Sequence, residues 1–417
     1  MEKLEVMGGK SLKGTVTVGG SKNAALPIIC ASLLTKEKVV LENVPNIADI
    51  RSMIQILEGI GAKIKFEKNK LEIDSSVLKS RKISEKLVKK MRASILVMGA
   101  LLHRFGDVKM AFPGGCVLGK RTLSSHTYAF EQFGAKVIDE EKGLHVKAKG
   151  LIGAKIILPE LSVTATENAV MTAVLAKGDT EIRLSATEPH VQDLCNFLNK
   201  MGAKISGIGT NIIKIKGVKS LKGVHYKITG DYLEAGTLAI AAVATKGDVV
   251  IKGICTSDLD SFWQKMEEIG AKFTLKDNEV HIYPSKEING VRILRTAVHP
   301  SFATDLQAPF TVLLTQAKGV SKIFETLFEG RLNYLFELEK MGAHIEFLNP
   351  HQALIIGSRE LKGMPISSCD IRAGAAMVIA ALIANGKTEI SNINYIDRGY
   401  ENLDGKLRSL GAAIKRI

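Results

Sequence analysis

The chain has few cysteines, a single tryptophan and no long apolar run, and these scarcities exclude several classes of protein. Its five cysteines lie far apart along 417 residues, without paired or metal-type spacing, so we expect neither a disulfide framework nor a metal site. The longest apolar stretches, such as residues 373–384, are too short to span a membrane. Residues 1–5 include acidic side chains and do not resemble a signal peptide. We therefore expect a cytoplasmic protein.

Positive charge, in contrast, is abundant. Lysine and arginine number 57 against 43 acidic residues, for a net charge of +14, and 46% of the residues are hydrophobic. This composition indicates a globular protein with a sizeable core and two or three domains. The basic residues are scattered and do not alternate with aromatics, as they do in many nucleic-acid-binding proteins. A small polyanionic substrate drawn into a basic cleft is the other explanation.

A Gly-Ala dipeptide recurs at intervals of 68 to 73 residues. Its glycines are Gly61, Gly134, Gly202, Gly270, Gly342 and Gly411. An amphipathic pattern precedes each glycine, as at positions 50, 53, 54 and 57, and a short strand pattern follows it. Each repeat also contains a helix that is apolar almost all round, such as 165–177, 233–246 and 373–385, and such helices are expected to be buried. The sequence therefore predicts two α/β domains of three repeats each.

Polar and charged residues gather where the apolar helices begin. Lys22, Arg92 and Arg372 lie at three of these starts, and Asp231 and Asp305 at two others. Free backbone N–H groups and the helix dipole favour anions at a helix N-terminus, whereas cations there are unfavourable unless an anion binds. N-capping accounts for Asp231. The three cations predict an anion-binding face.

The glycine-rich stretch Pro113-Gly114-Gly115-Cys116-Val117-Leu118-Gly119-Lys120-Arg121 carries a single cysteine at its centre. Lys120 and Arg121 would lower the pKa of its thiol and favour the thiolate, although a thiol placed there can equally donate a proton. The other four cysteines, Cys30, Cys195, Cys255 and Cys369, are expected to be packing residues.

Six segments in order along the chain resemble one known family. They are residues 20–27, 91–94, 113–116, 304–305 with 328–331, 370–374 and 396–401. In this order they are similar to the UDP-N-acetylglucosamine 1-carboxyvinyltransferases, the enolpyruvyl transferases that begin bacterial peptidoglycan synthesis. The resemblance implies two inside-out α/β domains with buried parallel helices and an active site in the interdomain cleft. It places residues 22–229 in the first domain, and residues 1–21 with 230–417 in the second.

The resemblance also implies an addition–elimination reaction. Phosphoenolpyruvate joins the sugar 3-hydroxyl through its C2, passes through a tetrahedral ketal, and loses phosphate. Cys116 corresponds to the proton donor and to the thiol that forms a covalent adduct, Asp305 to the base, and Lys22 and Arg398 to further catalytic residues. The phosphoenolpyruvate-binding positions are Lys22, Asn23, Arg121, Arg331, Arg372 and Arg398. The sugar-nucleotide positions are Asn23, Arg92, Arg121, Thr122, Leu123, Ser124, Ser125, Ser162, Val163, Thr164, Thr304, Asp305 and Leu327, with Asp370 and His126 behind them.

Several residues depart from the family pattern, mostly toward the nucleotide end. They are Thr122, Ser124, Thr164, Tyr232 and Gly330. They leave open a divergent paralogue with another nucleotide-sugar acceptor or without activity. A shikimate-pathway enolpyruvyl transferase and a basic repeat protein that binds nucleic acid are further alternatives, and Cys116 argues against both. The expected partners are the two small substrates, without cofactor, nucleic acid, membrane or obligate protein partner. The family also implies roles in cell shape and division and sensitivity to fosfomycin.

Overall fold

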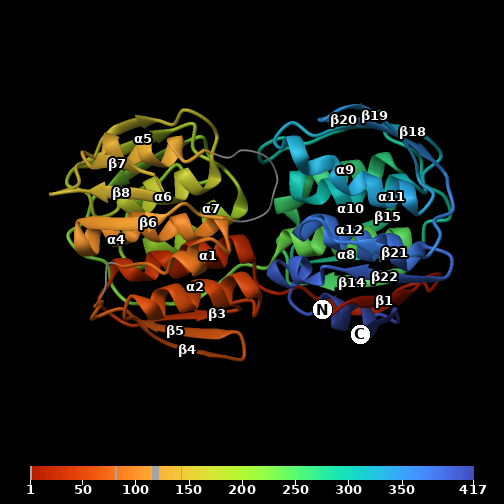
Figure 1. Ribbon diagram of the computed structural model, residues 1–417, viewed down its shortest axis with the longest axis horizontal. Helices are drawn as coiled ribbons and strands as arrows, with labels where there is room; N and C mark the ends of the chain where they lie inside the picture. Colours follow the sequence, from red (N-terminus) through yellow and green to blue (C-terminus); the bar gives the residue numbers. More distant parts are fainter. Residues whose placement is uncertain (1, 80–81, 115–121, 142) are drawn as a thin grey trace. The chain divides into compact units, whose positions relative to one another are not determined.

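A computed structural model describes residues 2–79, 82–114, 122–141 and 143–417 of the chain (Figure 1). The described residues form two compact units. The continuous unit holds residues 20–229, and the split unit holds residues 2–19 and 230–417, in each case as far as they are described. The domain boundaries expected above lie close to this division and stay a prediction about parts that fold on their own.

Each unit contains three β-sheets, and five of the six sheets have four strands. The sheets of the continuous unit are β13 (His225–Lys227)–β3 (Val39–Glu42)–β5 (Lys70–Asp74)–β4 (Lys63–Glu67), β6 (Asp107–Ala111)–β8 (Gly143–Lys147)–β7 (Lys136–Glu140), and β11 (Lys204–Ser206)–β12 (Ile212–Lys216)–β10 (Asp179–Arg183)–β9 (Lys155–Ile157). The sheets of the split unit are β21 (Pro365–Ser367)–β22 (Lys387–Ser391)–β1 (Leu4–Met7)–β23 (Ala413–Arg416), β15 (Lys272–Lys276)–β16 (Glu279–Tyr283)–β14 (Asp248–Lys252)–β2 (Lys13–Thr17), and β17 (Ile293–Arg295)–β18 (Gly319–Phe324)–β20 (Gln352–Gly357)–β19 (His344–Asn349).

All four-stranded sheets share one pairing pattern. One edge strand pairs in parallel with its neighbour, and the remaining pairs are antiparallel, as in β9–β10, β10–β12 and β11–β12. In the three-stranded sheet, an isolated parallel bridge between Lys82 and Lys109 takes the place of the parallel edge strand that the other sheets have. The common pattern confirms the six repeats predicted from the Gly-Ala spacing.

The two ends of the chain meet in one sheet. Strand β1 lies between β22 and β23 and is antiparallel to both, so the N-terminal strand completes the last repeat. Strand β2 pairs in parallel with β14 in the split unit, whereas β13 pairs in parallel with β3 in the continuous unit. Among the described residues the chain therefore passes between the units near residues 20 and 230.

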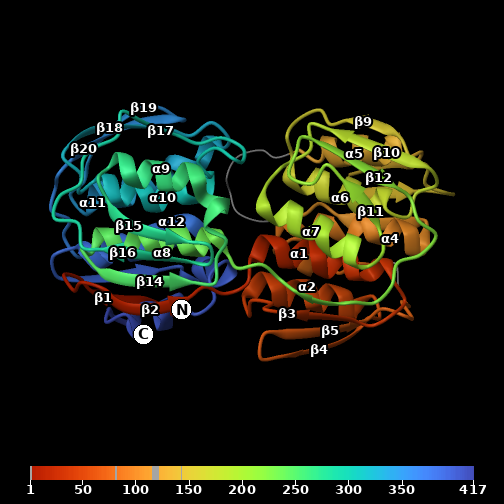
Figure 2. The same cartoon turned by 180° about the vertical axis from the view of Figure 1, so that it is seen from behind.

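One apolar helix in each repeat is buried, as predicted. These helices are α1 (Lys22–Ala31), α4 (Val97–Phe105), α6 (Val163–Ala173), α8 (Tyr232–Ala244), α10 (Thr304–Leu314) and α12 (Ile371–Ile383), and the 3₁₀ turn η2 (Arg92–Leu96) precedes α4. In α8 every residue from Tyr232 to Val243 is buried. In each unit these apolar helices lie inside, and the sheets lie outside them (Figures 1 and 2).

The predicted bounds of three buried helices were wrong by a few residues. Helices α6, α8 and α12 begin one or two residues earlier than expected, directly after the side-chain caps Ser162, Asp231 and Asp370. They also end two to four residues earlier than expected. In two cases the last residues of the predicted helix have another partner: Lys177 and Asn385 form isolated parallel bridges with Ile152 and Lys362.

The second helix of each repeat is amphipathic and ends at the Gly-Ala dipeptide. These helices are α2 (Ala48–Gly59), α5 (Ser124–Gln132), α7 (Pro189–Lys200), α9 (Asp260–Glu268), α11 (Leu335–Lys340) and α13 (Leu403–Ser409). The glycine after each has a φ between 82° and 105°. Because side chains other than glycine rarely adopt this left-handed conformation, glycine recurs at the helix stop. The shorter elements are α3 (Glu85–Val88), η1 (Ser32–Leu34), η3 (Thr256–Leu259), η4 (Glu329–Tyr334) and η5 (Ile393–Arg398).

Candidate active site

The predicted site residues divide between the two units. Cys116 and Arg121 lie outside the described residues, so their predicted roles stay predictions. The start of their segment is described: the Gly114 N–H donates to the Val88 carbonyl oxygen at 3.3 Å. A β-carbon on Gly114 would lie 1.8 Å from the Lys89 carbonyl oxygen. Glycine is therefore required where the segment passes the end of α3.

In the split unit Asp305 lies between two arginines. Its carboxylate accepts a hydrogen bond from Arg331 at 2.6 Å and pairs with Arg372 at 3.1 Å. Both guanidinium side chains are at most 5% exposed, whereas that of Asp305 is 26% exposed. The three residues come from α10, η4 and α12, so separate repeats build this group.

The ion pairs determine the charge of Asp305. Burial alone would raise the pKa of its carboxyl group, but the guanidiniums of Arg372 and Arg331 outweigh burial and hold the pKa well below its usual range. The carboxylate is therefore ionised at neutral pH. It does not cap α10, because the N-cap position is Ala303 and Asp305 makes no capping bond there. Its position in the first turn serves the two arginines instead.

Neighbouring polar groups fix the backbone around this group. Thr304 donates its hydroxyl to the buried Glu325 carboxylate at 2.8 Å, and the Leu327 N–H donates to the same side chain at 2.9 Å. Asp370 accepts hydrogen bonds from the backbone N–H groups of Arg372 and Ala373 at 2.7 and 2.9 Å and so caps α12. Sequence analysis missed Glu325, because nothing along the chain links it to Thr304, 21 residues away.

The buried helix starts of the split unit converge. The Tyr400 ring lies 5.1 Å from the Arg372 guanidinium, and its hydroxyl is 3.0 Å from that of Thr237 in α8. Burial alone would lower the pKa of Arg372, but nearby groups, among them Asp305 and Asp231, the cap of α8, raise it well above its usual range. Arg398, the last residue of η5, is half-buried. The N-terminal ends of α8, α10 and α12 thus surround one cluster of charges.

In the continuous unit Lys22 begins α1 and pairs with Asp49 at 2.7 Å. Both side chains are at most 10% exposed, and Asn23 beside them is half-buried. Ser21 caps the helix by accepting a hydrogen bond from the Ala24 N–H. Asp49 lies on α2 and was not predicted as a site residue.

A second group in the continuous unit gathers most of the predicted sugar-nucleotide residues. Arg92 donates to the Thr122 carbonyl oxygen at 2.5 Å, and the Thr122 and Ser124 hydroxyls are 2.8 Å apart. The Ser125 hydroxyl donates to Glu160 at 3.0 Å. Ser162 caps α6, and Leu123, Val163 and Thr164 are half-buried beside these residues in the sequence. Most of the set therefore lies around the starts of η2, α5 and α6.

His126 forms a hydrogen bond with the Thr164 side chain. Its Nε2 is 3.1 Å from the Thr164 hydroxyl, and its Nδ1 is 3.0 Å from the Asn168 side-chain nitrogen. Burial, with a contribution from Arg92, lowers the pKa of His126 to about 3, so the ring is neutral. Asn168 accepts at its oxygen from the Gly99 N–H, so its nitrogen donates to Nδ1 and the ring proton belongs on Nε2. Asn168 was also missed by sequence analysis.

Two expectations need correction. Lys22 and Arg372 were expected to need a bound anion at the helix starts, but each already forms an ion pair within the protein, with Asp49 and Asp305 respectively. Of the four cysteines expected to be packing residues, Cys30 and Cys195 are buried, but Cys255 and Cys369 are exposed. Within the described residues no group of three histidine, cysteine or acidic side chains could hold a metal ion.

Comparisons with known proteins identify the family. The family model of EPSP synthase (3-phosphoshikimate 1-carboxyvinyltransferase) matches residues 6–407. Proteins named UDP-N-acetylglucosamine 1-carboxyvinyltransferase are 42% identical in Borrelia garinii subsp. bavariensis, covering 99% of this chain and 98% of the relative, and 44% identical in Chlorobaculum parvum, covering 100% and 98%.

Solved structures show the same fold. The enolpyruvyl transferase NikO from Streptomyces tendae has a TM-score of 0.90 at 22% identity, covering 100% of this chain and 99% of that one. EPSP synthase from Acinetobacter baumannii has a TM-score of 0.77 at 18% identity and covers both chains fully. Family model, relatives and fold agree with the resemblance in the sequence motifs: the chain is an enzyme of the enolpyruvyl transferase family and belongs with the UDP-N-acetylglucosamine 1-carboxyvinyltransferases.

Proposed function

We propose that the protein transfers the enolpyruvyl group of phosphoenolpyruvate to the 3-hydroxyl of UDP-N-acetylglucosamine, with release of phosphate. The observation that carries this proposal is the position of Asp305 between two buried arginines at the converging starts of three helices. A carboxylate beside fixed cations suits a reaction in which a hydroxyl loses its proton next to an anionic co-substrate. The names of relatives more than 40% identical over their full length support the same reaction.

The addition step requires three events. The 3-hydroxyl oxygen bonds to C2 of phosphoenolpyruvate, its proton goes to Asp305, and C3 receives a proton from Cys116. In the elimination step C3 gives a proton back to the Cys116 thiolate, the C2–C3 double bond of the enol ether forms, and the bond from C2 to the phosphate oxygen breaks. Phosphate leaves with the proton that Asp305 took up. Lys22, Arg121 and Arg398 would hold the phosphoenolpyruvate anion, with Arg331 and Arg372 beside them.

The two arginines couple anion binding to the strength of the base. With Arg331 and Arg372 paired to it, Asp305 is a weak base, because its pKa is held low. A substrate carboxylate or phosphate that shares these guanidiniums would weaken their pull on Asp305 and raise its pKa toward the usual range. Asp305 would then accept a proton more readily after phosphoenolpyruvate binds than before.

The continuous unit would supply most of the sugar-nucleotide contacts. Arg92, Thr122, Ser124, Ser125, Ser162 and Thr164 present hydroxyl, guanidinium and helix-start groups suited to a diphosphate and a sugar. Thr164, which departs from the family's glycine, has its hydroxyl fixed by His126. The cleft location of the combined site stays a prediction of the resemblance.

A phosphate-release assay with a panel of acceptors tests the proposal. Purified protein, phosphoenolpyruvate and UDP-N-acetylglucosamine should release phosphate. Shikimate 3-phosphate in place of the sugar nucleotide should give none. Release with shikimate 3-phosphate alone would assign the shikimate-pathway reaction, release only with another nucleotide sugar would assign a divergent acceptor, and no release with any acceptor would indicate an inactive paralogue.

The cellular role follows from the reaction. The product would enter peptidoglycan synthesis, so we propose that loss of the protein impairs cell-wall formation, cell shape and division, and that fosfomycin inhibits it. We propose a cytoplasmic location and two small-molecule substrates as its only required partners. No helix among the described residues is long and apolar enough to cross a membrane.

A further inference from the structure

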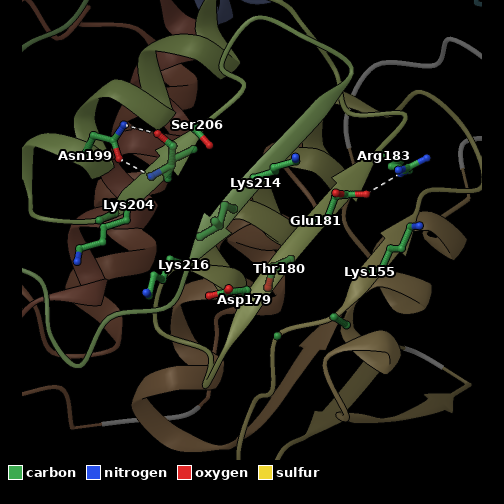
Figure 3. Close-up of a pocket in the computed structure, with 15 residues that line it drawn as sticks. Lys155, Asp179, Thr180, Glu181, Arg183, Asn199, Lys204, Ser206, Lys214 and Lys216 are labelled. Carbon is green, nitrogen blue, oxygen red and sulfur yellow. Dashed lines mark hydrogen bonds and ion pairs between the residues drawn. The ribbon is translucent and has the colours of Figure 1, made fainter.

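One outer sheet of the continuous unit carries four lysines that form no ion pair with a described residue. In the sheet β11–β12–β10–β9 the side chains that alternate toward solvent include Lys155, Lys204, Lys214 and Lys216, all exposed. Lys204 lies directly opposite Lys216 in the strand pairing. Like charges placed directly opposite each other on a sheet are destabilising. None of these four lysines forms an ion pair with another described residue. We call this surface the lysine face (Figure 3).

Two acidic residues lie on the same face but form no ion pair with these lysines. Asp179 lies opposite Lys216, and Glu181 lies opposite both Lys214 and Lys155. The Glu181 carboxylate binds Arg183 at 2.7 Å; that hydrogen bond lowers the pKa of Glu181, and the charges of Lys155 and Lys214 add to the effect. Figure 3 shows this ion pair on one side of the hollow with Lys155 near it, and Lys204 and Lys216 on the other side. With Asp179 included, the lining holds five basic and two acidic residues. The face therefore carries a net positive charge.

The corresponding sheets of other repeats are built differently. In β15–β16–β14–β2, Glu279 pairs with Lys276 at 2.7 Å and with Lys252 at 3.7 Å. In β21–β22–β1–β23, Glu5 pairs with Lys387 and Lys415 at 3.3 and 2.9 Å. A central carboxylate thus neutralises lysines from neighbouring strands there. On the lysine face the central carboxylate, Glu181, forms its ion pair with Arg183 of its own strand instead, and the lysines opposite it form none. The excess of positive charge is therefore not a general feature of the fold.

The shape and composition of the lysine face favour an extended anionic surface. The lysines spread over three strands around an open hollow of about 920 Å³. The hollow's lining includes no aromatic side chain on which nucleic-acid bases could stack. Ile157, two residues after Lys155 on the same edge strand, is 53% exposed, and Leu184 at the end of β10 is 40% exposed. Exposed aliphatic side chains beside lysines are typical of surfaces that contact anionic lipid.

We propose that the lysine face docks the protein reversibly on the surface of an anionic phospholipid bilayer. The lysines would contact headgroup phosphates, and Ile157 and Leu184 would enter the interface beside them. The expectation of no membrane partner rested on the absence of a spanning segment, which a peripheral contact does not need. Each lysine near an anionic membrane strengthens binding about fivefold, so four lysines give weak, salt-sensitive association.

Vesicle sedimentation tests the proposal. The full-length protein should sediment with phosphatidylcholine vesicles that contain phosphatidylglycerol, not with phosphatidylcholine alone, and salt should release it. The triple variant Lys204→Ala, Lys214→Ala, Lys216→Ala should bind on the order of 100-fold more weakly. The matched control is Lys252→Ala, Lys272→Ala, Lys276→Ala, which removes the same charge from the equivalent sheet of the split unit and should bind within a few-fold of the unaltered protein. Ile157→Ser should weaken binding without changing the charge.

Three results would overturn the proposal. The first is an absence of vesicle binding at low salt. The second is equal loss in both triple variants, which would assign the effect to overall charge. The third is stronger binding to polyuridine or tripolyphosphate than to vesicles, which would assign the lysine face to nucleic acid or to a free phosphate ligand. Phosphate release should be the same in all these variants, because none of the altered residues lies in the proposed active site, so this test is independent of the proposed function.

Discussion

Asp305 shows why a catalytic role depends on partners that are distant in sequence. Next to Thr304 in a known pattern, it could be predicted as a base. The ion pairs with Arg331 and Arg372 could not, because they join positions that only the fold brings together. The same holds for Asp49, Glu325 and Asn168, which have no local signal and whose roles follow from contacts with residues distant in sequence.

The first prediction concerns Asp305. We expect Asp305→Asn to lower kcat by roughly 10²–10⁴-fold while the KM for UDP-N-acetylglucosamine changes little, because a base acts mainly in the transition state. The control is Asp404→Asn, which also removes a buried carboxylate paired with two arginines, Arg408 and Arg416. That variant should retain its kcat. A rise in KM alone for Asp305→Asn would make Asp305 a binding residue.

The second prediction concerns Cys116. Cys116→Ala should lose most activity, by roughly 10²–10⁴-fold, because alanine cannot donate a proton. Cys116→Asp should keep activity, because a carboxylic acid can. Steady-state phosphate release measures both variants. Unchanged turnover in Cys116→Ala would remove this residue from the mechanism.

The third prediction concerns the selectivity of fosfomycin, an epoxide phosphonate. We expect one covalent adduct, on Cys116, formed faster with UDP-N-acetylglucosamine present and slowed by phosphoenolpyruvate. Burial raises the pKa of the Cys30 and Cys195 thiols, the latter to about 12, and burial with Glu337 and Asp370 raises that of Cys369. Thiolates are the reactive form, so these three should remain unlabelled. Exposed Cys255 is the internal control in peptide mapping, and labelling there, or in Cys116→Asp, would contradict the assignment.

At the scale of elements, the pattern of apolar residues predicts what is buried better than where an element ends. All four apolar positions read on α2, Ile50, Met53, Ile54 and Leu57, are buried. The ends of α6 and α12 were misplaced at Lys177 and Asn385, which form isolated bridges with Ile152 and Lys362, and such pairing is not encoded in periodicity. A polar residue inside a buried helix is equally invisible to an apolar pattern.

Glu167 in α6 is such a residue, and it supports the fourth prediction. Burial, and then the charge of Glu188, raise its pKa well above the usual value, and its Oε1 has no hydrogen-bond partner among the described residues. An acid whose pKa rises on folding favours the folded state at low pH. Its contribution is lost as pH increases from the unfolded pKa to the folded one, at up to about 1.4 kcal/mol per pH unit.

Urea unfolding of Glu167→Gln at about pH 5 and pH 8 measures this contribution. We expect the variant to lose less stability than the unaltered protein over this interval, because glutamine does not ionise. Glu58→Gln, which removes an exposed carboxyl from α2, should leave the pH dependence as it is. An identical pH dependence in Glu167→Gln would show that Glu167 is not a buried acid in solution.

At the scale of the whole molecule, the repeat count followed from the Gly-Ala period, but the assignment of the N-terminal segment did not. Periodicity places residues 1–21 beside the first repeat. The structure instead puts β1 between β22 and β23, and pairs β2 with β14. This arrangement has a consequence for folding: residues 230–417 alone would lack one central and one edge strand of their sheets.

The last prediction uses the chain termini. Lys3 and Ile417 exchange backbone hydrogen bonds at 2.9 and 3.0 Å, so a short linker can join the two ends. We expect a polypeptide of residues 230–417, a short glycine–serine linker and residues 1–21 to unfold cooperatively in urea. Residues 230–417 alone should not, because removal of β1 leaves backbone groups of β22 and β23 unpaired. Residues 22–229, which retain β13 beside β3, should also fold alone. Cooperative unfolding of 230–417 without residues 1–21 would show that the N-terminal strands are dispensable and that the predicted domain boundary is wrong.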